Sequence, residues 1–173
     1  QRFLQKYGKE PTPEELATNI SSKTKLLVLN SPSNPTGCVY TKKELESIAE
    51  ICVKKKIFVL SDEIYEKIIF DGLQHVSIAS FGKDIYDLTV TVNGLSKSHS
   101  MTGWRIGYLG APQDVADAIS NVQDHSTSNP TSIAQKAAVA ALGLPDDFAA
   151  QMTREFVKRR DIGGSLLPIR AAA

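Results

Sequence analysis

The sequence has no long apolar run and no excess of charge of either sign. Apolar runs such as Leu26 to Leu29 fall far short of the roughly 18 residues that a membrane-spanning helix needs. Twenty Lys and Arg stand against 19 Asp and Glu, so the formal net charge is +1, and like charges form no long block. We therefore expect no membrane span and no broad electrostatic surface for nucleic acid.

Cysteine is almost absent as well. Cys38 and Cys52 form no CxxC pair and have no histidine close to them in the sequence, which argues against a zinc site and against a disulfide framework. His75, His99 and His125 show no metal-ligand spacing. We predict no metal site, two packing thiols and a reducing, cytoplasmic compartment.

Internal repeats, low-complexity segments and a signal-peptide pattern are absent too. The chain begins at Gln1 without a Met, so we expect it to be part of a longer sequence, and residues 163–173 lose all periodicity, as a cut or frayed end would. With 173 residues, 42% hydrophobic and 23% charged, the composition is that of a globular chain with one core.

Strand and helix patterns alternate along this chain. Thr41 and Glu44 form a capping box that opens a helix over about 41–54, and the apolar run 57–60 is typical of a parallel strand covered on both faces. Further strands are predicted at 25–30, at 88–93 and within 105–112, and further helices after Pro112, at about 131–142 and at about 146–160. The sequence therefore predicts a three-layer α/β fold with a mixed, mostly parallel sheet and helices on both faces.

Polar residues follow the ends of these predicted strands: Asn34, the pair Asp62 and Tyr65, Lys97, and Arg105. Each alone has an ordinary explanation, such as a turn, a helix cap, a solvated loop lysine or an ion-pair partner. Because ligands of α/β sheets bind beyond the carboxyl ends of the strands, we expect these side chains to converge on one edge.

Two known motifs were tested against this pattern. The segment "FVLSDE" is similar to the acidic strand end of P-loop NTPases, but their phosphate loop is missing, because Ser77 precedes Gly82–Lys83 where a glycine is needed and Asp84 follows. An SxxK nucleophile pair is excluded because Gly94 stands three residues before Lys97.

The stretch "GLSKSHSMTGWRIG" closely resembles the lysine signature of class I aminotransferases. The restricted positions of that signature are met by Gly94, Ser96, Lys97, Ser100, Met101, Gly103, Arg105, Ile106 and Gly107. The family motifs "NPTG" at 34–37 and "SDEIY" at 61–65 occur in the expected order and spacing. The wording "MTGWRIGY" is most similar to the aspartate aminotransferase branch of bacteria and plants.

This resemblance implies a site for pyridoxal 5′-phosphate. Lys97 is the implied catalytic residue, which bonds the cofactor and moves a proton between the substrate Cα and the cofactor. Asp62 is implied to pair with the ring nitrogen, Asn34 and Tyr65 to donate hydrogen bonds to the phenolic oxygen, and Arg105 to bind the phosphate. It also implies a cis peptide bond between Asn34 and Pro35.

Some parts of the family's site are missing from the sequence. In many relatives a serine that contacts the phosphate stands at the position of Gly94, and Ser96 is only a weak substitute. The upstream phosphate loop and stacking aromatic are missing, as is the downstream arginine for the substrate carboxylate, for which Arg170 is a poor replacement. We expect residues 1–143 to form part of the large cofactor domain, and 144–173 to form a helix leading toward a small domain.

The resemblance implies a transaminase that moves an amino group from an amino acid, aspartate or another dicarboxylate, to a 2-oxo acid. It also implies a role in amino acid metabolism and a homodimer at full length. Two other hypotheses share the cofactor residues: a C–S β-lyase, and the effector-sensing domain of a transcription regulator with a winged-helix segment upstream. An inactive fragment is the fourth.

Overall fold

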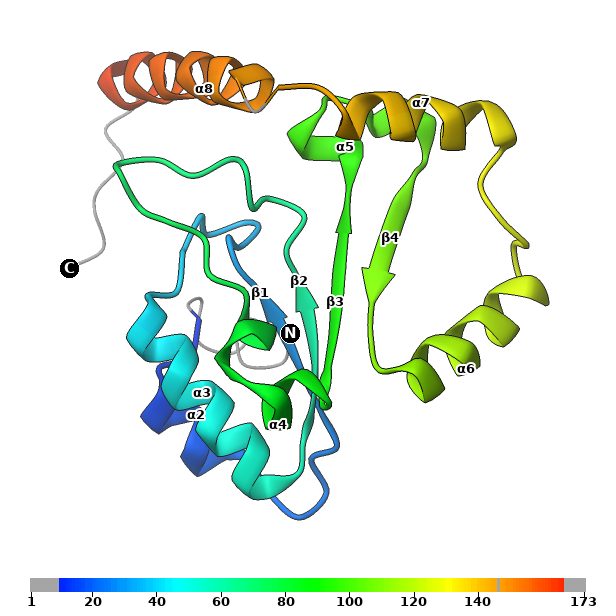
Figure 1. Ribbon diagram of the computed structural model, residues 1–173. Helices are drawn as coiled ribbons and strands as arrows, with labels where there is room; N and C mark the ends of the chain where they lie inside the picture. The colour runs from blue at the N-terminus through cyan, green and yellow to red at the C-terminus, as the bar shows by residue number, and fades with distance from the viewer. Residues whose placement is uncertain (1–9, 146, 167–173) are drawn as a thin grey trace.

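The computed structural model of the chain describes residues 10–145 and 147–166. In chain order the elements are α2 (Pro13–Asn19), β1 (Leu26–Asn30), α3 (Lys42–Lys55), β2 (Phe58–Asp62), α4 (Lys83–Tyr86), β3 (Thr89–Gly94), α5 (Leu95–Ser98), β4 (Gly107–Gly110), α6 (Gln113–Asp124), α7 (Ser132–Leu142) and α8 (Asp147–Leu166) (Figure 1). Short 3-10 turns at Ile78–Phe81 and Thr102–Trp104 complete them. The predicted α/β class is confirmed.

The four strands form one sheet in the order β1-β2-β3-β4. The first three run parallel, and β4 pairs antiparallel with β3. Asn30 lies beside Asp62, and Asp62 lies beside Val92, so the carboxyl ends of the parallel strands are level with one another. Residues that follow these strands therefore share one edge of the sheet, which Figure 1 shows beneath α5, α7 and α8.

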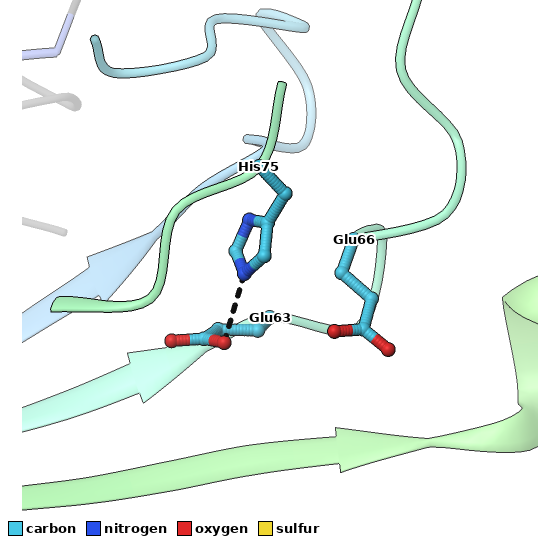
Figure 2. A group of neighbouring side chains, drawn as sticks. All are labelled: Glu63, Glu66 and His75. Carbon is cyan, nitrogen blue, oxygen red and sulfur yellow. Dashed lines mark hydrogen bonds and ion pairs between the residues drawn. The ribbon is translucent and has the colours of Figure 1, made fainter. Parts of the chain in front are cut away.

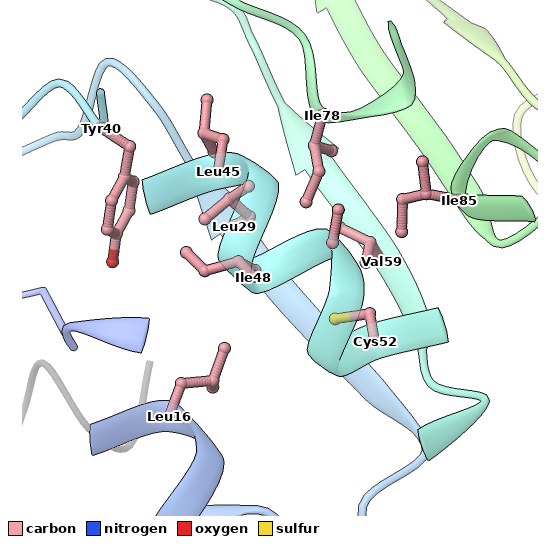
Figure 3. Packing of buried hydrophobic residues seen from close by; sticks show 10 residues of the cluster. Leu16, Leu29, Tyr40, Leu45, Ile48, Cys52, Val59, Ile78 and Ile85 are labelled. Atoms are coloured by element: carbon pink, nitrogen blue, oxygen red, sulfur yellow. The ribbon is translucent and has the colours of Figure 1, made fainter. Parts of the chain in front are cut away.

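Helix α3 covers one face of this sheet. The predicted capping box forms, since the Glu44 backbone N–H donates to Thr41 Oγ1 at 3.3 Å and the Thr41 N–H donates to the Glu44 carboxylate at 2.8 Å. Its apolar stripe then packs against strands β1 and β2, with α2 and α4 beside it (Figure 3). The buried residues of this core are Leu16, Leu29, Tyr40, Leu45, Ile48, Ala49, Cys52, Val59, Ile78 and Ile85.

The opposite face of the sheet is open in the part of the chain that the structure describes. Leu26, Val28 and Phe58 point to it with 50%, 46% and 44% of their surface exposed. The expectation that the strand at 57–60 is covered on both faces is therefore wrong for Phe58 among these residues, although Val59 is fully buried. Alternation along a strand sends neighbours to opposite faces, and α2, α3 and α4 cover only one.

The second half of the chain packs around α5 and α7. Leu95, Met101 and Ile106 form a second apolar cluster with alanines of α7. The described part of the chain contains no helix long and apolar enough to cross a membrane. Arg170 and the aperiodic tail from 167 onward lie outside the described residues.

Candidate functional site

Three of the predicted site residues meet at the carboxyl edge of the sheet. Lys97 lies in α5, directly after β3, and its Nζ is 5.6 Å from the centroid of the Tyr65 ring. The Asn34 side-chain amide donates a hydrogen bond to the Tyr65 hydroxyl at 3.4 Å. The Asn34–Pro35 peptide bond is cis, as predicted. The loops after β1, β2 and β3 therefore bring an amide, a phenol and an amine together.

Asp62 ends β2 and faces away from the α3 core. Its carboxylate accepts the Ile64 backbone N–H at 3.2 Å, and its side chain is partly exposed. The chain then makes one helical turn, in which the Glu66 N–H donates to the Glu63 carbonyl at 2.9 Å. This turn carries Tyr65, three residues beyond Asp62 in the chain.

Arg105 lies farther along the same edge, in a left-handed backbone conformation with φ 53°. Its guanidinium Nη1 donates to the Thr102 carbonyl at 2.9 Å, and its side chain is exposed. No contact between Arg105 and Lys97 is recorded among the described residues, so its convergence on the same ligand stays a prediction.

A cavity of about 520 Å³ opens beside Lys97. Its lining residues are Tyr65, Ile68, Phe70, Ser96, Lys97, Ser100, Thr102 and Phe156. The apolar side of this cavity, with Phe156 contributed by α8, was not predicted. No motif marks these positions, and the apolar stretch after "SDEIY" was the one signal that could have indicated them.

Helix α8 is held over this edge by contacts to the loop after Tyr65. Arg160 donates to both carboxylate oxygens of Asp71, at 3.0 and 2.8 Å, and its guanidinium lies 5.4 Å from the Phe70 ring centroid. Thr153 donates its hydroxyl to the Lys67 carbonyl at 3.0 Å. Residues far apart in the sequence thereby close one side of the Lys97 cavity.

Behind Asp62, Glu63 points into the protein and is buried (Figure 2). Its carboxylate accepts hydrogen bonds from Ser61 Oγ at 2.9 Å and Ser77 Oγ at 2.8 Å, and pairs with His75 Nε2 at 2.9 Å. Burial alone would raise the pKa of this carboxyl, but the hydrogen bonds outweigh it and lower the pKa below its usual 4.5. The cluster ties the end of β2 to the loop that carries His75.

The same cluster has the composition of a cation site. Glu63, Glu66 and His75 each bring one potential ligand atom to within 4.8 Å of the others. The Glu63 carboxylate already accepts hydrogen bonds from two serine hydroxyls, and His75 Nε2 already faces its other oxygen. We therefore assign the cluster a structural role, which is to hold the end of β2 against the loop that carries His75. Sequence reasoning on the motif at 61–65 assigned Glu63 no role.

The space around Gly94 is too small for a side chain, which accounts for a glycine instead of a serine three residues before Lys97. A Cβ atom at Gly94 would lie 2.9 Å from the Ile106 carbonyl oxygen and 3.1 Å from the Gly107 Cα. Both are backbone atoms, so a side chain here requires β3 and β4 to move apart. Ser96, by contrast, lines the cavity and remains available to a ligand.

The arrangement agrees with the likeness to known proteins. The sequence profile of the family described as Aminotransferase class I and II matches residues 3–162. An aspartate aminotransferase of Geobacillus stearothermophilus is 50% identical over 151 residues, which is 87% of this chain and 38% of that protein. The chain thus spans about two fifths of the length of such relatives.

Solved structures give the same likeness. The crystal structure of the aspartate aminotransferase from Rhizobium meliloti matches with a TM-score of 0.85 and 40% identity, over 88% of this chain and 38% of that one. The aromatic aminotransferase from Pyrococcus horikoshii OT3 matches with a TM-score of 0.86 and 37% identity, over 93% and 43%. One fold is therefore shared by relatives whose names give different substrates.

Proposed function

Because the chain belongs to the class I and II aminotransferase family, we propose that its protein is a pyridoxal-phosphate-dependent transaminase. The observation that carries this proposal is the lysine amine of Lys97 beside the hydrogen-bonded pair of Asn34 and Tyr65, at the carboxyl edge of the sheet. Residues 1–143 belong to the large cofactor domain in this proposal, and 144–173 lead toward a small domain.

The groups at this edge suit the proposed cofactor. An amine, a carboxylate, a guanidinium and an amide–phenol pair match an aldehyde, a ring nitrogen, a phosphate and a phenolic oxygen. When bound, pyridoxal phosphate supplies the aldehyde that takes up an amino group, and a ring that withdraws electrons from the substrate Cα. The cavity beside Lys97 is lined by both apolar and polar side chains, as cofactor pockets commonly are, and of the proposed cofactor residues Tyr65 and Lys97 line it.

Each residue then has a physical task. Lys97 moves a proton between the substrate Cα and the cofactor C4′, which its flexible four-carbon stem allows. The Asp62 carboxylate holds a proton on the ring nitrogen, because an adjacent negative charge favours the protonated form.

The remaining groups fix the position of the cofactor. Asn34 and Tyr65 donate hydrogen bonds to the phenolic oxygen, which their mutual contact brings into reach of both. Arg105 binds the phosphate through charge-assisted hydrogen bonds, whose forked geometry a lysine does not reproduce.

For the substrate we propose aspartate or another dicarboxylic amino acid, with a 2-oxo acid as acceptor. The named relative at 50% identity is an aspartate aminotransferase, whereas the aromatic aminotransferase is 37% identical. We further propose a homodimer at full length and a location in the cytoplasm. The arginine that binds the substrate carboxylate would come from outside the described residues.

The test uses purified full-length protein. Pyridoxal phosphate should give a visible absorption band that Lys97→Ala lacks, and aspartate should discharge this band while its 2-oxo acid is released. A 2-oxo acceptor should then restore the band. Binding of the cofactor without release of any 2-oxo acid would contradict a transaminase.

Repeating the measurement with a thioether amino acid, and assaying thiol and ammonia as well, separates the alternatives. A C–S β-lyase would release a thiol, ammonia and pyruvate from a thioether amino acid, and an effector-sensing regulator would release nothing. The relatives named above are all aminotransferases, which favours a transaminase over a lyase or a regulator.

A further inference from the structure

Asn30, the last residue of β1, joins two of the proposed cofactor residues. Its Oδ1 accepts the backbone N–H of Asn34 at 2.8 Å, and its Nδ2 donates to the backbone carbonyl of Asp62 at 3.2 Å. Asn30 is partly buried and belongs to none of the sequence motifs described above.

The strand register explains why one side chain reaches both. Asn30 is paired directly with Asp62 across the parallel ladder, and the loop after β1 turns back so that the Asn34 N–H faces the end of the strand. A bridge of this kind needs a donor and an acceptor on one short, uncharged side chain, and the amide of asparagine supplies both.

We propose that Asn30 is a positioning residue that sets the separation of Asn34 and Asp62, a role that rests on the proposed cofactor site. Asn34 and Asp62 address two different atoms of the cofactor ring, and they come from loops of two different strands. The Ser31 backbone N–H also donates to the Asp62 carbonyl, at 3.2 Å, so the start of the loop is tied to β2 by the backbone alone. Without the Asn30 bridge, Asn34 loses its link to this strand end, and the donor to the phenolic oxygen is less firmly held in register with the carboxylate.

The alternative hypothesis is that Asn30 only fills space at the end of β1, without a role for its hydrogen bonds. Two substitutions separate these roles. Asn30→Ala removes both hydrogen bonds and most of the volume, whereas Asn30→Leu removes both hydrogen bonds, keeps the volume and suits a strand. The matched control is Asn19→Ala, which removes another asparagine amide bonded to a backbone carbonyl, that of Glu15 at 2.7 Å. Asn19 ends α2, and this hydrogen bond stays within the helix and reaches none of the proposed cofactor residues.

The first measurement is the pH titration of the cofactor's visible band in the full-length protein. Hydrogen-bond donors to the phenolic oxygen stabilise negative charge on it and so favour the deprotonated form of the bound cofactor. Weakening these donors should therefore raise the midpoint pH of the titration. We expect a rise of roughly 0.5 to 1 unit in both Asn30 variants, the equivalent of about one hydrogen bond. Asn19→Ala should leave the midpoint unchanged.

The second measurement is steady-state kinetics. Because the bridge aligns groups around the cofactor and not around the amino acid, kcat should fall about three- to tenfold in both variants while KM changes less than about twofold. A midpoint at the wild-type value in Asn30→Leu would overturn the proposal, as would loss of folding in both variants. Absence of any visible band in the wild-type protein would instead overturn the proposed function.

Discussion

Gly94, the last residue of β3, is paired with Gly107 of β4, and an added Cβ would lie 2.9 Å from the Ile106 carbonyl oxygen. Since its φ of 174° is ordinary extended backbone, the need for glycine is purely one of space. The same position holds a serine in many proteins with the lysine signature, so the proposed phosphate site of this chain lacks that hydroxyl. The separation of the two strands therefore decides one detail of the proposed cofactor site.

Gly94→Ala should destabilise the protein by about 1–3 kcal/mol, because its Cβ would overlap backbone atoms that cannot rotate away. Gly110→Ala is the matched control, since it lies in β4 beside β3 and its added Cβ would meet nothing within 4 Å. Chemical denaturation of both variants measures the difference. Equal stabilities would contradict the steric account.

The Glu63 cluster should make stability depend on acid. A carboxyl whose pKa is lowered by folding adds stability above its unfolded-state pKa, and that contribution is lost as the pH falls through the lower folded-state value. Ser77→Ala removes one donor to Glu63, so the pKa should rise and the free energy of unfolding at neutral pH should fall by about 1–2 kcal/mol.

The difference from wild type should narrow as the pH falls through the lowered folded-state pKa of Glu63, because below it the carboxyl is protonated in both proteins. Ser80→Ala is the control, because its hydroxyl donates to the Ser77 carbonyl and not to Glu63. Denaturation curves from about pH 3 to about pH 7 test this. A difference that stays constant with pH would show that Ser77 acts by packing alone.

At the scale of elements, α8 matters because Phe156 lines the Lys97 cavity. Asp71→Ala removes the ion pair that joins Arg160 to the loop and leaves Arg160 with its ion pair to Asp161, within α8. Exposed ion pairs contribute little to global stability. We therefore expect an almost unchanged melting temperature but faster amide hydrogen exchange in α8 and in the loop at 67–71. Asp87→Ala, which breaks the exposed pair with Lys83, is the control and should leave α8 unchanged.

The elements that the sequence predicted are those with strong local signals. The capping box at Thr41 and the stripe that follows give α3, and the apolar runs give β1, β2 and β3 nearly at their observed bounds. The short helices α4 and α5 and the helix α2 were not predicted. With as few as four residues, α4 and α5 have too little periodicity to recognise and form where the chain must turn after other elements.

The candidate site likewise contains residues that the sequence predicted and contacts that it did not. Asn34, Asp62, Tyr65 and Lys97 lie at the sheet edge because motif order and strand direction place them there. The Asn30 bridge and the Phe156 contact depend on register and on a helix docking from far along the chain. Such pairings leave no mark in a single sequence.

At the scale of the whole molecule, one face of the sheet is uncovered by residues 10–145 and 147–166. Leu26, Val28 and Phe58 form an exposed apolar surface, and surfaces of this kind mark contacts or promote association. The 173-residue chain alone should bind a hydrophobic dye and self-associate. Substituting Val28→Thr with Phe58→Thr should reduce both effects.

Leu73→Thr is the control for that prediction, because Leu73 is 53% exposed but lies in a loop away from the sheet. Dye fluorescence and sedimentation report the two effects. A wild-type chain that binds no dye would show that this face is covered in solution, and would contradict the exposure of Leu26, Val28 and Phe58.

The central claim is that Lys97 is the residue that bonds the cofactor. The most direct measurement adds pyridoxal phosphate to the full-length protein, reduces the carbon–nitrogen link to the lysine with borohydride, and maps the added mass by peptide mass spectrometry. The account predicts the mass on the peptide that contains Lys97 and its loss in Lys97→Ala. A label on another lysine, or an equal label spread over many lysines, would contradict it.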